Sequence, residues 1–175
     1  MRGPNHVNVL TKLCLDVDGV LTDGSVLIDD AGVETKRFFV RDGTAIRMWQ
    51  RSGGLIAIIT GRRGEALRHR ARELGIEHLL EGVDRKGEAF DALLASLGVD
   101  AEEAAMVGDD LPDLPILERC GYPVAVRDAA AEIIDAACHV TTATGGRGAV
   151  REVVELLLKA RGDWDSSVER YRERD

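Results

Sequence analysis

Short runs of apolar residues alternate with longer amphipathic segments between residues 12 and 160. Runs such as 12–17 and Leu55–Thr60 lack the polar alternation of a sheet with one wet face, so both of their faces should be buried. Amphipathic segments such as 64–74 and Lys86–Leu97 end at a glycine, as helices commonly do. The alternation predicts an α/β fold, with a Rossmann-like, doubly wound parallel sheet and helices on both faces.

The remaining elements follow from the same periodicity. We expect strands at 78–80, 104–107, 123–126 and 139–140, and helices at 43–52, 112–118, 129–136 and 149–160. Turn-forming residues at 29–32 separate two β-branched runs and predict a hairpin insertion over about 24–39. Asp42 is the expected cap of the helix that follows the hairpin.

The length of 175 residues fits one domain, which we place at 1–161. The charged, aperiodic segment 162–175 is expected to be a disordered tail or an assembly arm. An exposed Phe38-Phe39 pair would suit packing against another subunit, although packing on the chain's own core explains it as well.

Composition excludes several classes of function. The chain has 31 acidic and 23 basic residues, a net charge of -8, which argues against binding to nucleic acid. No apolar run is long enough to span a membrane, and the N-terminal segment lacks the pattern of a signal peptide. Three cysteines without metal-ligand spacing indicate neither a disulfide framework nor a zinc site. We expect a cytoplasmic protein.

Acidic residues gather where predicted strands end. Asp16 and Asp18 follow the first strand, and Asp109, Asp110 and Asp113 follow the strand at 104–107. Ligands of parallel sheets bind beyond these carboxyl ends, and clustered carboxylates favour a hard cation such as Mg²⁺. Each cluster also has a simpler interpretation, as solvated turn aspartates or as a helix-capping turn at Asp110.

Two further positions suit a phosphate group. Thr60-Gly61 ends the second long strand and is expected to open a helix, where a hydroxyl and free N–H groups can bind phosphate oxygens. Lys86 begins its own helix, where a cation opposes the helix dipole. A role in pairing with carboxylates and with a phosphoryl group explains Lys86 better. A capping turn and a surface lysine are the structural alternatives.

These pieces occur in the order of a known family. Asp16-x-Asp18-Gly19-Val20, Thr60, Lys86 and Gly108-Asp109-Asp110 resemble the four motifs of haloacid dehalogenase-like phosphatases. The strings LDVDGVLTDG, VRDG, IITGR, GDDLPDLP and GGRGAVREV resemble those of the cap-less 3-deoxy-D-manno-octulosonate 8-phosphate (KDO 8-phosphate) phosphatases. The resemblance covers most of the chain, from about residue 12 to residue 160.

The resemblance implies a Mg²⁺-dependent phosphatase with an aspartyl-phosphate intermediate. Asp16 would be the nucleophile, and Asp18 the general acid and then the base. Asp16, Asp109 and the backbone carbonyl of Asp18 would bind Mg²⁺. Thr60, Gly61 and Lys86 would bind the phosphoryl oxygens. Asp110 and Asp113 would order metal-bound water or Lys86.

The same resemblance bears on substrate and assembly. The 41 residues between Asp18 and Thr60 and the 25 between Thr60 and Lys86 leave no room for a cap domain. Members without a cap complete their sites as homotetramers, with the hairpin building the assembly and the segment 145–148 near a substrate pocket. A sugar-acid carboxylate needs an arginine, and the candidates are Arg62, Arg70 and Arg147.

Two alternatives to the hydrolysis of KDO 8-phosphate remain open, one with a different substrate and one with a different class of function. Arg62 stands where phosphatases for sialic-type 9-phosphates tend to carry glutamate, which favours the eight-carbon substrate without excluding the nine-carbon one. A different class of function is a non-catalytic partner of a sugar-activating cytidylyltransferase. The intact acidic clusters argue against that, because an inactive site has no need for crowded carboxylates.

Overall fold

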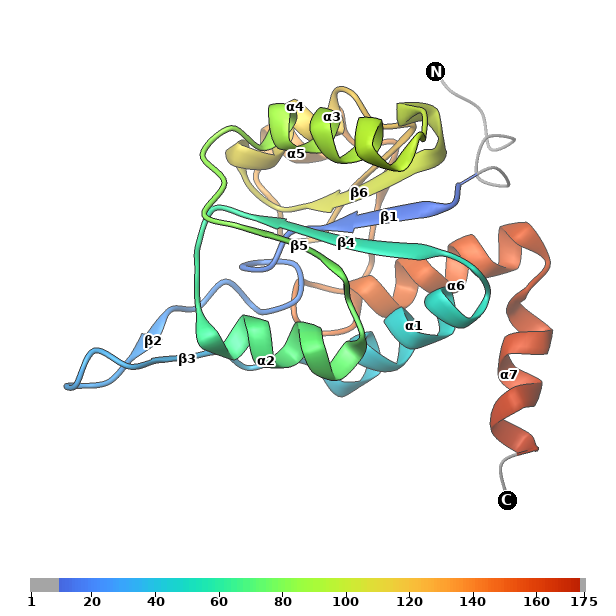
Figure 1. Cartoon of the computed structure of the whole chain (residues 1–175), viewed down its shortest axis with the longest axis horizontal. Coiled ribbons are helices and arrows are strands. Elements are labelled where there is room, and N and C mark those ends of the chain that lie inside the picture. Colours follow the sequence, from blue (N-terminus) through green and yellow to red (C-terminus); the bar gives the residue numbers. More distant parts are fainter. Residues whose placement is uncertain (1–9, 174–175) are drawn as a thin grey trace.

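The computed structural model describes residues 10–173 and contains the predicted parallel sheet (Figure 1). Six strands pair in the spatial order β5-β4-β1-β6-β7-β8. They are β1 (Lys12–Leu15), β4 (Leu55–Thr60), β5 (His78–Glu81), β6 (Ala104–Gly108), β7 (Tyr122–Ala125) and β8 (His139–Val140). Every pairing is parallel, as the apolar strands predict.

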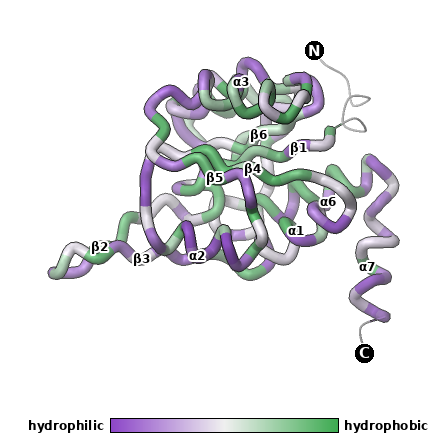
Figure 2. Tube along the Cα trace, viewed as in Figure 1, coloured by the Kyte–Doolittle hydropathy of each residue, from purple (hydrophilic) through white to green (hydrophobic). Residues whose placement is uncertain are grey.

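Helices cover both faces of the sheet (Figure 1). One face carries α1 (Val40–Arg51), α2 (Glu65–Leu74) and α6 (Ala149–Arg161), and the other carries α3 (Lys86–Leu97), α4 (Leu114–Leu117) and α5 (Ala131–Ala136). Short 3-10 turns lie at Ala101–Glu103 and Leu111–Asp113. Apolar residues concentrate on the strands and on the inner sides of the helices (Figure 2). No helix within residues 10–173 combines the length and apolarity that crossing a membrane requires.

The hairpin projects from the body between β1 and α1 (Figure 1). It consists of β2 (Leu27–Ile28) and β3 (Glu34–Thr35), so each of its strands is only two residues long. Leu27 and Ile28 are exposed. Phe38 and Phe39 are only half-exposed, and Phe38 packs against the main core, so the expected exposed pair is wrong and the core-packing alternative holds for Phe38.

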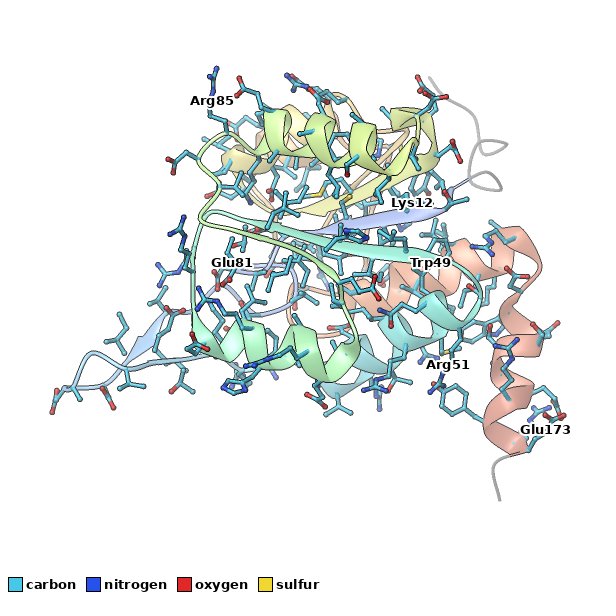
Figure 3. All side chains as sticks on the ribbon, in the orientation of Figure 1. Lys12, Trp49, Arg51, Glu81, Arg85 and Glu173 are labelled. Atoms are coloured by element: carbon cyan, nitrogen blue, oxygen red, sulfur yellow. The ribbon has the colours of Figure 1, made fainter. Side chains whose placement is uncertain are left out.

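The segment after Gly162 folds as α7 (Trp164–Arg172), so the expected disordered tail is wrong for these residues. The Trp164 ring lies against the cationic groups of Arg151 and Lys159 of α6, 5.2 and 5.4 Å from its centroid. Arg51 extends from α1 towards α7 and donates to the Tyr171 hydroxyl at 3.2 Å (Figure 3). Trp164, Val168 and Tyr171 lie at helical spacing, and Trp164 and Val168 pack against the main core, which holds this segment in place.

Candidate active site

The carboxyl ends of three neighbouring strands meet at one edge of the sheet. Leu15 of the central strand β1 is in register with Ile58 of β4 and Val107 of β6. The chain positions that follow are therefore neighbours across the edge, which is why residues distant in sequence share one cavity of about 490 Å³. Nine of the expected site residues line it: Asp16, Asp18, Thr60, Gly61, Arg62, Lys86, Asp109, Asp110 and Asp113.

Three carboxylates and one ammonium form the floor of this cavity. Oxygen atoms of Asp16, Asp109 and Asp113 lie within 4.8 Å of one another. Lys86 Nζ donates to Asp16 Oδ1 at 2.7 Å and to Asp113 Oδ1 at 2.6 Å. Asp109 Oδ1 is buried and accepts no hydrogen bond. The cluster therefore carries more negative than positive charge in a poorly solvated place.

The electrostatics of the cluster favour a cation. Burial, together with the charge of Asp113, raises the pKa of Asp16 to about 6. Burial and the charge of Asp16 raise the pKa of Asp109 to about 8. Both shifts mean that Lys86 alone does not compensate the charge of the ionised carboxylates. An oxygen-only set such as Asp16, Asp109 and Asp113 fits Mg²⁺.

Lys86 is the first residue of α3, as predicted, and is only 6 % exposed. Burial alone would lower the pKa of Lys86, but the charges of Asp16 and Asp113 raise it above its ordinary value. The ammonium therefore stays charged between the two carboxylates. Asp113 Oδ2 also accepts from the backbone N–H of Asp109 at 3.1 Å, so it orders both Lys86 and the loop after β6.

Asp110 and Thr60 occupy the rim of the cavity. The Asp110 carboxylate accepts from the backbone N–H of Leu111 at 2.8 Å, in the capping turn that the sequence suggests. Thr60 is buried, and its hydroxyl accepts from the backbone N–H of Arg62 at 3.3 Å. Helix α2 begins only at Glu65, so the expectation that Thr60-Gly61 opens a helix is wrong. Phosphate donors here would be loop amides, since four residues separate Thr60 from the helix.

Asp18 lies apart from the three clustered carboxylates. Its Oδ1 accepts from Lys36 Nζ at 2.5 Å, and its Oδ2 is 3.7 Å from Arg62 Nε. Glu34 pairs with both of these cations. Sequence reasoning missed Glu34 and Lys36. Their spacing is the available signal, because two charged residues two positions apart lie on the same face of an extended segment.

The segment 145–148 packs against the loop that follows Asp16. Gly146 donates its backbone N–H to Val20 O at 2.9 Å. A side chain at Gly145 would have its Cβ 1.7 Å from Gly19 O, so only glycine permits this approach. Gly19 itself has φ of 97°, and a residue with a side chain at this position would clash with Asp109. Close backbone contact therefore holds the loop after Asp16 against the segment 145–148 of the same chain.

Asp42 has a different role from the one expected. Helix α1 begins at Val40, so Asp42 lies inside its first turn and does not cap it. Asp42 Oδ1 instead accepts from the backbone N–H of Arg151, at 2.8 Å, in the first turn of α6. Gly148, at the start of α6, has no side chain to cap that helix. Asp42 supplies the cap from another helix and so anchors the end of segment 145–148.

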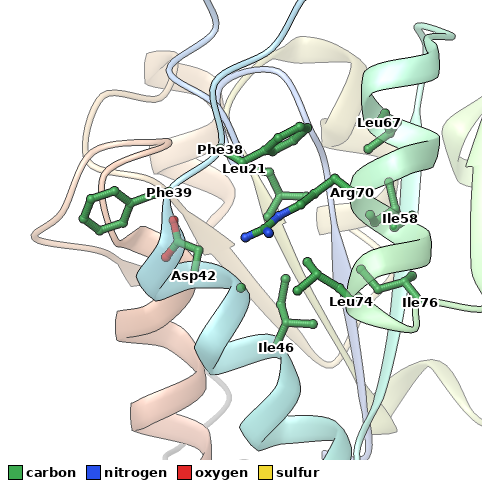
Figure 4. A pocket seen from close by; sticks show the side chains of 12 residues that line it. Leu21, Phe38, Phe39, Asp42, Ile46, Ile58, Leu67, Arg70, Leu74 and Ile76 are labelled. Carbon is green, nitrogen blue, oxygen red and sulfur yellow. The ribbon is translucent and has the colours of Figure 1, made fainter.

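Arg70 and Arg147 do not line the cavity. The Arg70 guanidinium lies beside the Phe38 ring, near Asp42, in a small pocket between α1 and α2 (Figure 4). It also pairs with Glu73 at 2.8 Å. Arg147 is exposed and lies 3.8 Å from Asp23. Of the three candidate arginines, Arg62 is the one placed at the cavity of its own subunit.

Comparison with known proteins supports the pattern of motifs. A family model described as haloacid dehalogenase-like hydrolase matches residues 78–153. The chain is 47 % identical, over 94 % of its length and 91 % of the relative, to 3-deoxy-D-manno-octulosonate 8-phosphate phosphatase of Salmonella typhi. It is 46 % identical, over the same shares, to the enzyme of that name from Escherichia coli strain K12.

Solved structures show the same architecture. The 3-deoxy-D-manno-octulosonate 8-phosphate phosphatase of Moraxella catarrhalis, in complex with magnesium, phosphate and KDO, superposes with a TM-score of 0.94 and 38 % identity. The match covers 96 % of this chain and 97 % of that one. A cobalt-bound phosphatase of the same name from Haemophilus influenzae superposes with a TM-score of 0.88 and 38 % identity, covering 91 % and 93 %.

Proposed function

The chain belongs to the KDO 8-phosphate phosphatase family of haloacid dehalogenase-like hydrolases, and on this basis we propose that it hydrolyses KDO 8-phosphate to KDO and phosphate. The observation that carries the proposal is the buried cluster of Asp16, Asp109 and Asp113 around Lys86 at the carboxyl edge of the sheet. Such a cluster fits Mg²⁺ and a phosphoryl group, and the magnesium complex of the M. catarrhalis protein supports this. The product is a sugar of lipopolysaccharide synthesis.

Asp16 is the proposed nucleophile. Lys86 holds its Oδ1 at 2.7 Å, and one carboxylate oxygen attacks phosphorus in line as the bond to the sugar oxygen breaks. The electron pair of that bond goes to the sugar oxygen, which takes a proton from Asp18. Water then attacks the aspartyl-phosphate, gives its proton to Asp18 and releases phosphate from Asp16.

The other cavity residues stabilise charge during both steps. Lys86, the Thr60 hydroxyl and the N–H groups after Thr60 would bind the phosphoryl oxygens, where negative charge shifts during transfer. Asp16, Asp109 and the backbone carbonyl of Asp18 would hold Mg²⁺, with Asp113 ordering Lys86. Bound Mg²⁺ supplies Lewis-acid neutralisation of the phosphoryl charge.

The substrate side of the site needs an arginine for the sugar carboxylate. Arg62 lines the cavity and is the proposed partner within the subunit. Arg147 is exposed outside that cavity and would act in the site of a neighbouring subunit, whereas the Arg70 guanidinium is enclosed beside Phe38 and Glu73. We therefore propose a homotetramer built through the hairpin, which exposes Val26, Leu27, Ile28 and Val33. We also infer a cytoplasmic location, where phosphorylated sugar acids are made and used.

The test is phosphate release in Mg²⁺ and in EDTA from KDO 8-phosphate, N-acetylneuraminate 9-phosphate and simple hexose phosphates. We expect selective, Mg²⁺-dependent release from KDO 8-phosphate, and none from the Asp16→Asn variant. Preference for the nine-carbon acid would refute the substrate assignment and the use of Arg62. No release from any substrate would refute the enzyme and favour a non-catalytic partner of a cytidylyltransferase.

A further inference from the structure

Four alternating charges form a closed ring beside the cavity. Lys36 Nζ lies 2.5 Å from Asp18 Oδ1 and 2.8 Å from Glu34 Oε1. Arg62 Nη2 lies 3.0 Å from Glu34 Oε2, and Arg62 Nε lies 3.7 Å from Asp18 Oδ2. Glu34 belongs to β3 and Lys36 follows it, so the hairpin contributes half of the ring.

The side chain of Lys36 is more buried than that of an ordinary surface lysine. Its side chain is 4 % exposed, whereas that of Arg62 is 45 % exposed. A lysine this buried keeps its charge only if carboxylates surround it, and Asp18 and Glu34 do so. Lys36 is absent from the cavity lining, while Arg62 is part of it. Lys36 therefore contacts Asp18 from outside the cavity lining, whereas Arg62 can contact the substrate.

The two oxygens of Asp18 have different surroundings. Oδ1 accepts from Lys36, while Oδ2 is buried and has no hydrogen-bond partner, with Arg62 Nε beyond hydrogen-bond distance. An ion pair on one oxygen fixes the direction of the carboxyl group, and the 17 % of the Asp18 side chain that stays exposed lines the cavity. A carboxylate only two residues from Asp16 could otherwise turn towards the cation-binding cluster.

We propose that Lys36 is a positioning residue, held by Glu34, that fixes the carboxyl group of Asp18 at the wall of the cavity, where the leaving sugar oxygen would lie. The inference rests on the proposed phosphatase function and adds two hairpin residues to it. In the first step the Asp16–phosphorus bond forms, the bond from phosphorus to the sugar oxygen breaks, and the proton on the Asp18 carboxyl group passes to that oxygen. In the second step water attacks phosphorus, the Asp16–phosphorus bond breaks, and the water returns a proton to Asp18.

The test uses two leaving groups of different basicity. The alcohol oxygen of KDO 8-phosphate needs a proton as it departs, whereas the phenolate of p-nitrophenyl phosphate departs almost unaided. The ratio kcat/KM covers the steps up to departure of the leaving group, so comparing this ratio between the two substrates isolates the effect of the proton transfer. A fault in folding or in phosphoryl binding would lower kcat/KM for both substrates alike.

We expect Lys36→Met to lower kcat/KM by at least ~10-fold for KDO 8-phosphate and by less than ~3-fold for p-nitrophenyl phosphate, since general acid catalysis contributes roughly 10²–10⁴-fold in all. Lys36→Arg, which keeps a cation, should restore most of the loss. Arg37→Met is the matched control. It removes an exposed cation of the same hairpin that pairs with Asp23, and it should leave both ratios unchanged.

A double-mutant cycle gives a second, independent measurement. If Lys36 acts through Asp18, then Lys36→Met should cost nothing further in an Asp18→Asn background. Equal losses on both substrates, or additive losses in the cycle, would overturn the inference while the wild-type enzyme remained active. A wild-type protein that releases no phosphate from KDO 8-phosphate would instead refute the proposed function. Unfolding temperature and light scattering show that each variant keeps its fold and assembly.

Discussion

The buried carboxyl group of Asp42 leads to a quantitative prediction about stability. Asp42 is 1 % exposed, its Oδ2 has no hydrogen-bond partner, and a cavity of about 10 Å³ adjoins it beside Arg70. Burial raises the pKa of Asp42 from 3.8 to about 6, although the N–H groups of Arg151 and Gly148 and the charges of Arg151 and Arg70 oppose the shift. The ionised form of Asp42 is therefore less stable in the folded protein than in the unfolded chain.

The sign of the pH dependence follows from the direction of that shift. Below pH 3.8 Asp42 is protonated in both states and contributes nothing to the pH dependence. Between pH 3.8 and about 6 the folded state holds a proton that the unfolded chain has lost, so the free energy of unfolding falls as pH rises. A shift of about two units corresponds to about 3 kcal/mol, of which about 2 kcal/mol is lost between pH ~4.5 and ~7.

Asp42→Asn tests this because Asn cannot ionise and keeps the Oδ1 acceptor for Arg151. Urea unfolding of both proteins in EDTA, from pH 4.5 to 8, gives the difference in the free energy of unfolding. We expect the variant to gain on the wild type by about 2 kcal/mol across this range, since other groups cancel in the difference. Asp91→Asn, which removes an exposed carboxylate on α3, is the matched control. A difference that does not change with pH would refute the burial argument.

The metal cluster and the hairpin allow two further predictions. Mg²⁺ should raise the unfolding temperature of the wild type, with a stabilisation of about 2.7 kcal/mol at a concentration 100 times the Kd, and Asp109→Asn should abolish the rise in calorimetry. Wild-type protein should be a tetramer in light scattering, and Leu27→Asp with Ile28→Asp should dissociate it, because charges would replace the apolar surface of β2. A wild-type monomer that is fully active at dilution would contradict the hairpin assembly.

Local patterns in the sequence were sufficient for most of the fold. Apolar runs identified the strands, and glycines marked the ends of α2 and α3, where Gly75 and Gly98 adopt left-handed conformations. Because parallel strands present their carboxyl ends at one edge, the order of the motifs also predicted that Asp16, Thr60 and Asp109 would share a cavity. Helix α7 was missed because only three apolar residues at helical spacing, Trp164, Val168 and Tyr171, mark it within an otherwise charged and polar segment.

By itself, the sequence determined the strand and helix types and the acidic edge of the sheet, since these depend on periodicity and on the direction of the strands. Only the tertiary structure decided the partners of individual charges. Asp42 caps a helix more than 100 residues away, and Lys36 pairs with Asp18 across the base of the hairpin. Such pairings depend on where separate elements pack in space, and no local propensity encodes that distance. The direction of the strands places Asp16 at the carboxyl edge of the sheet, but tertiary packing determines which groups hold its neighbours in place.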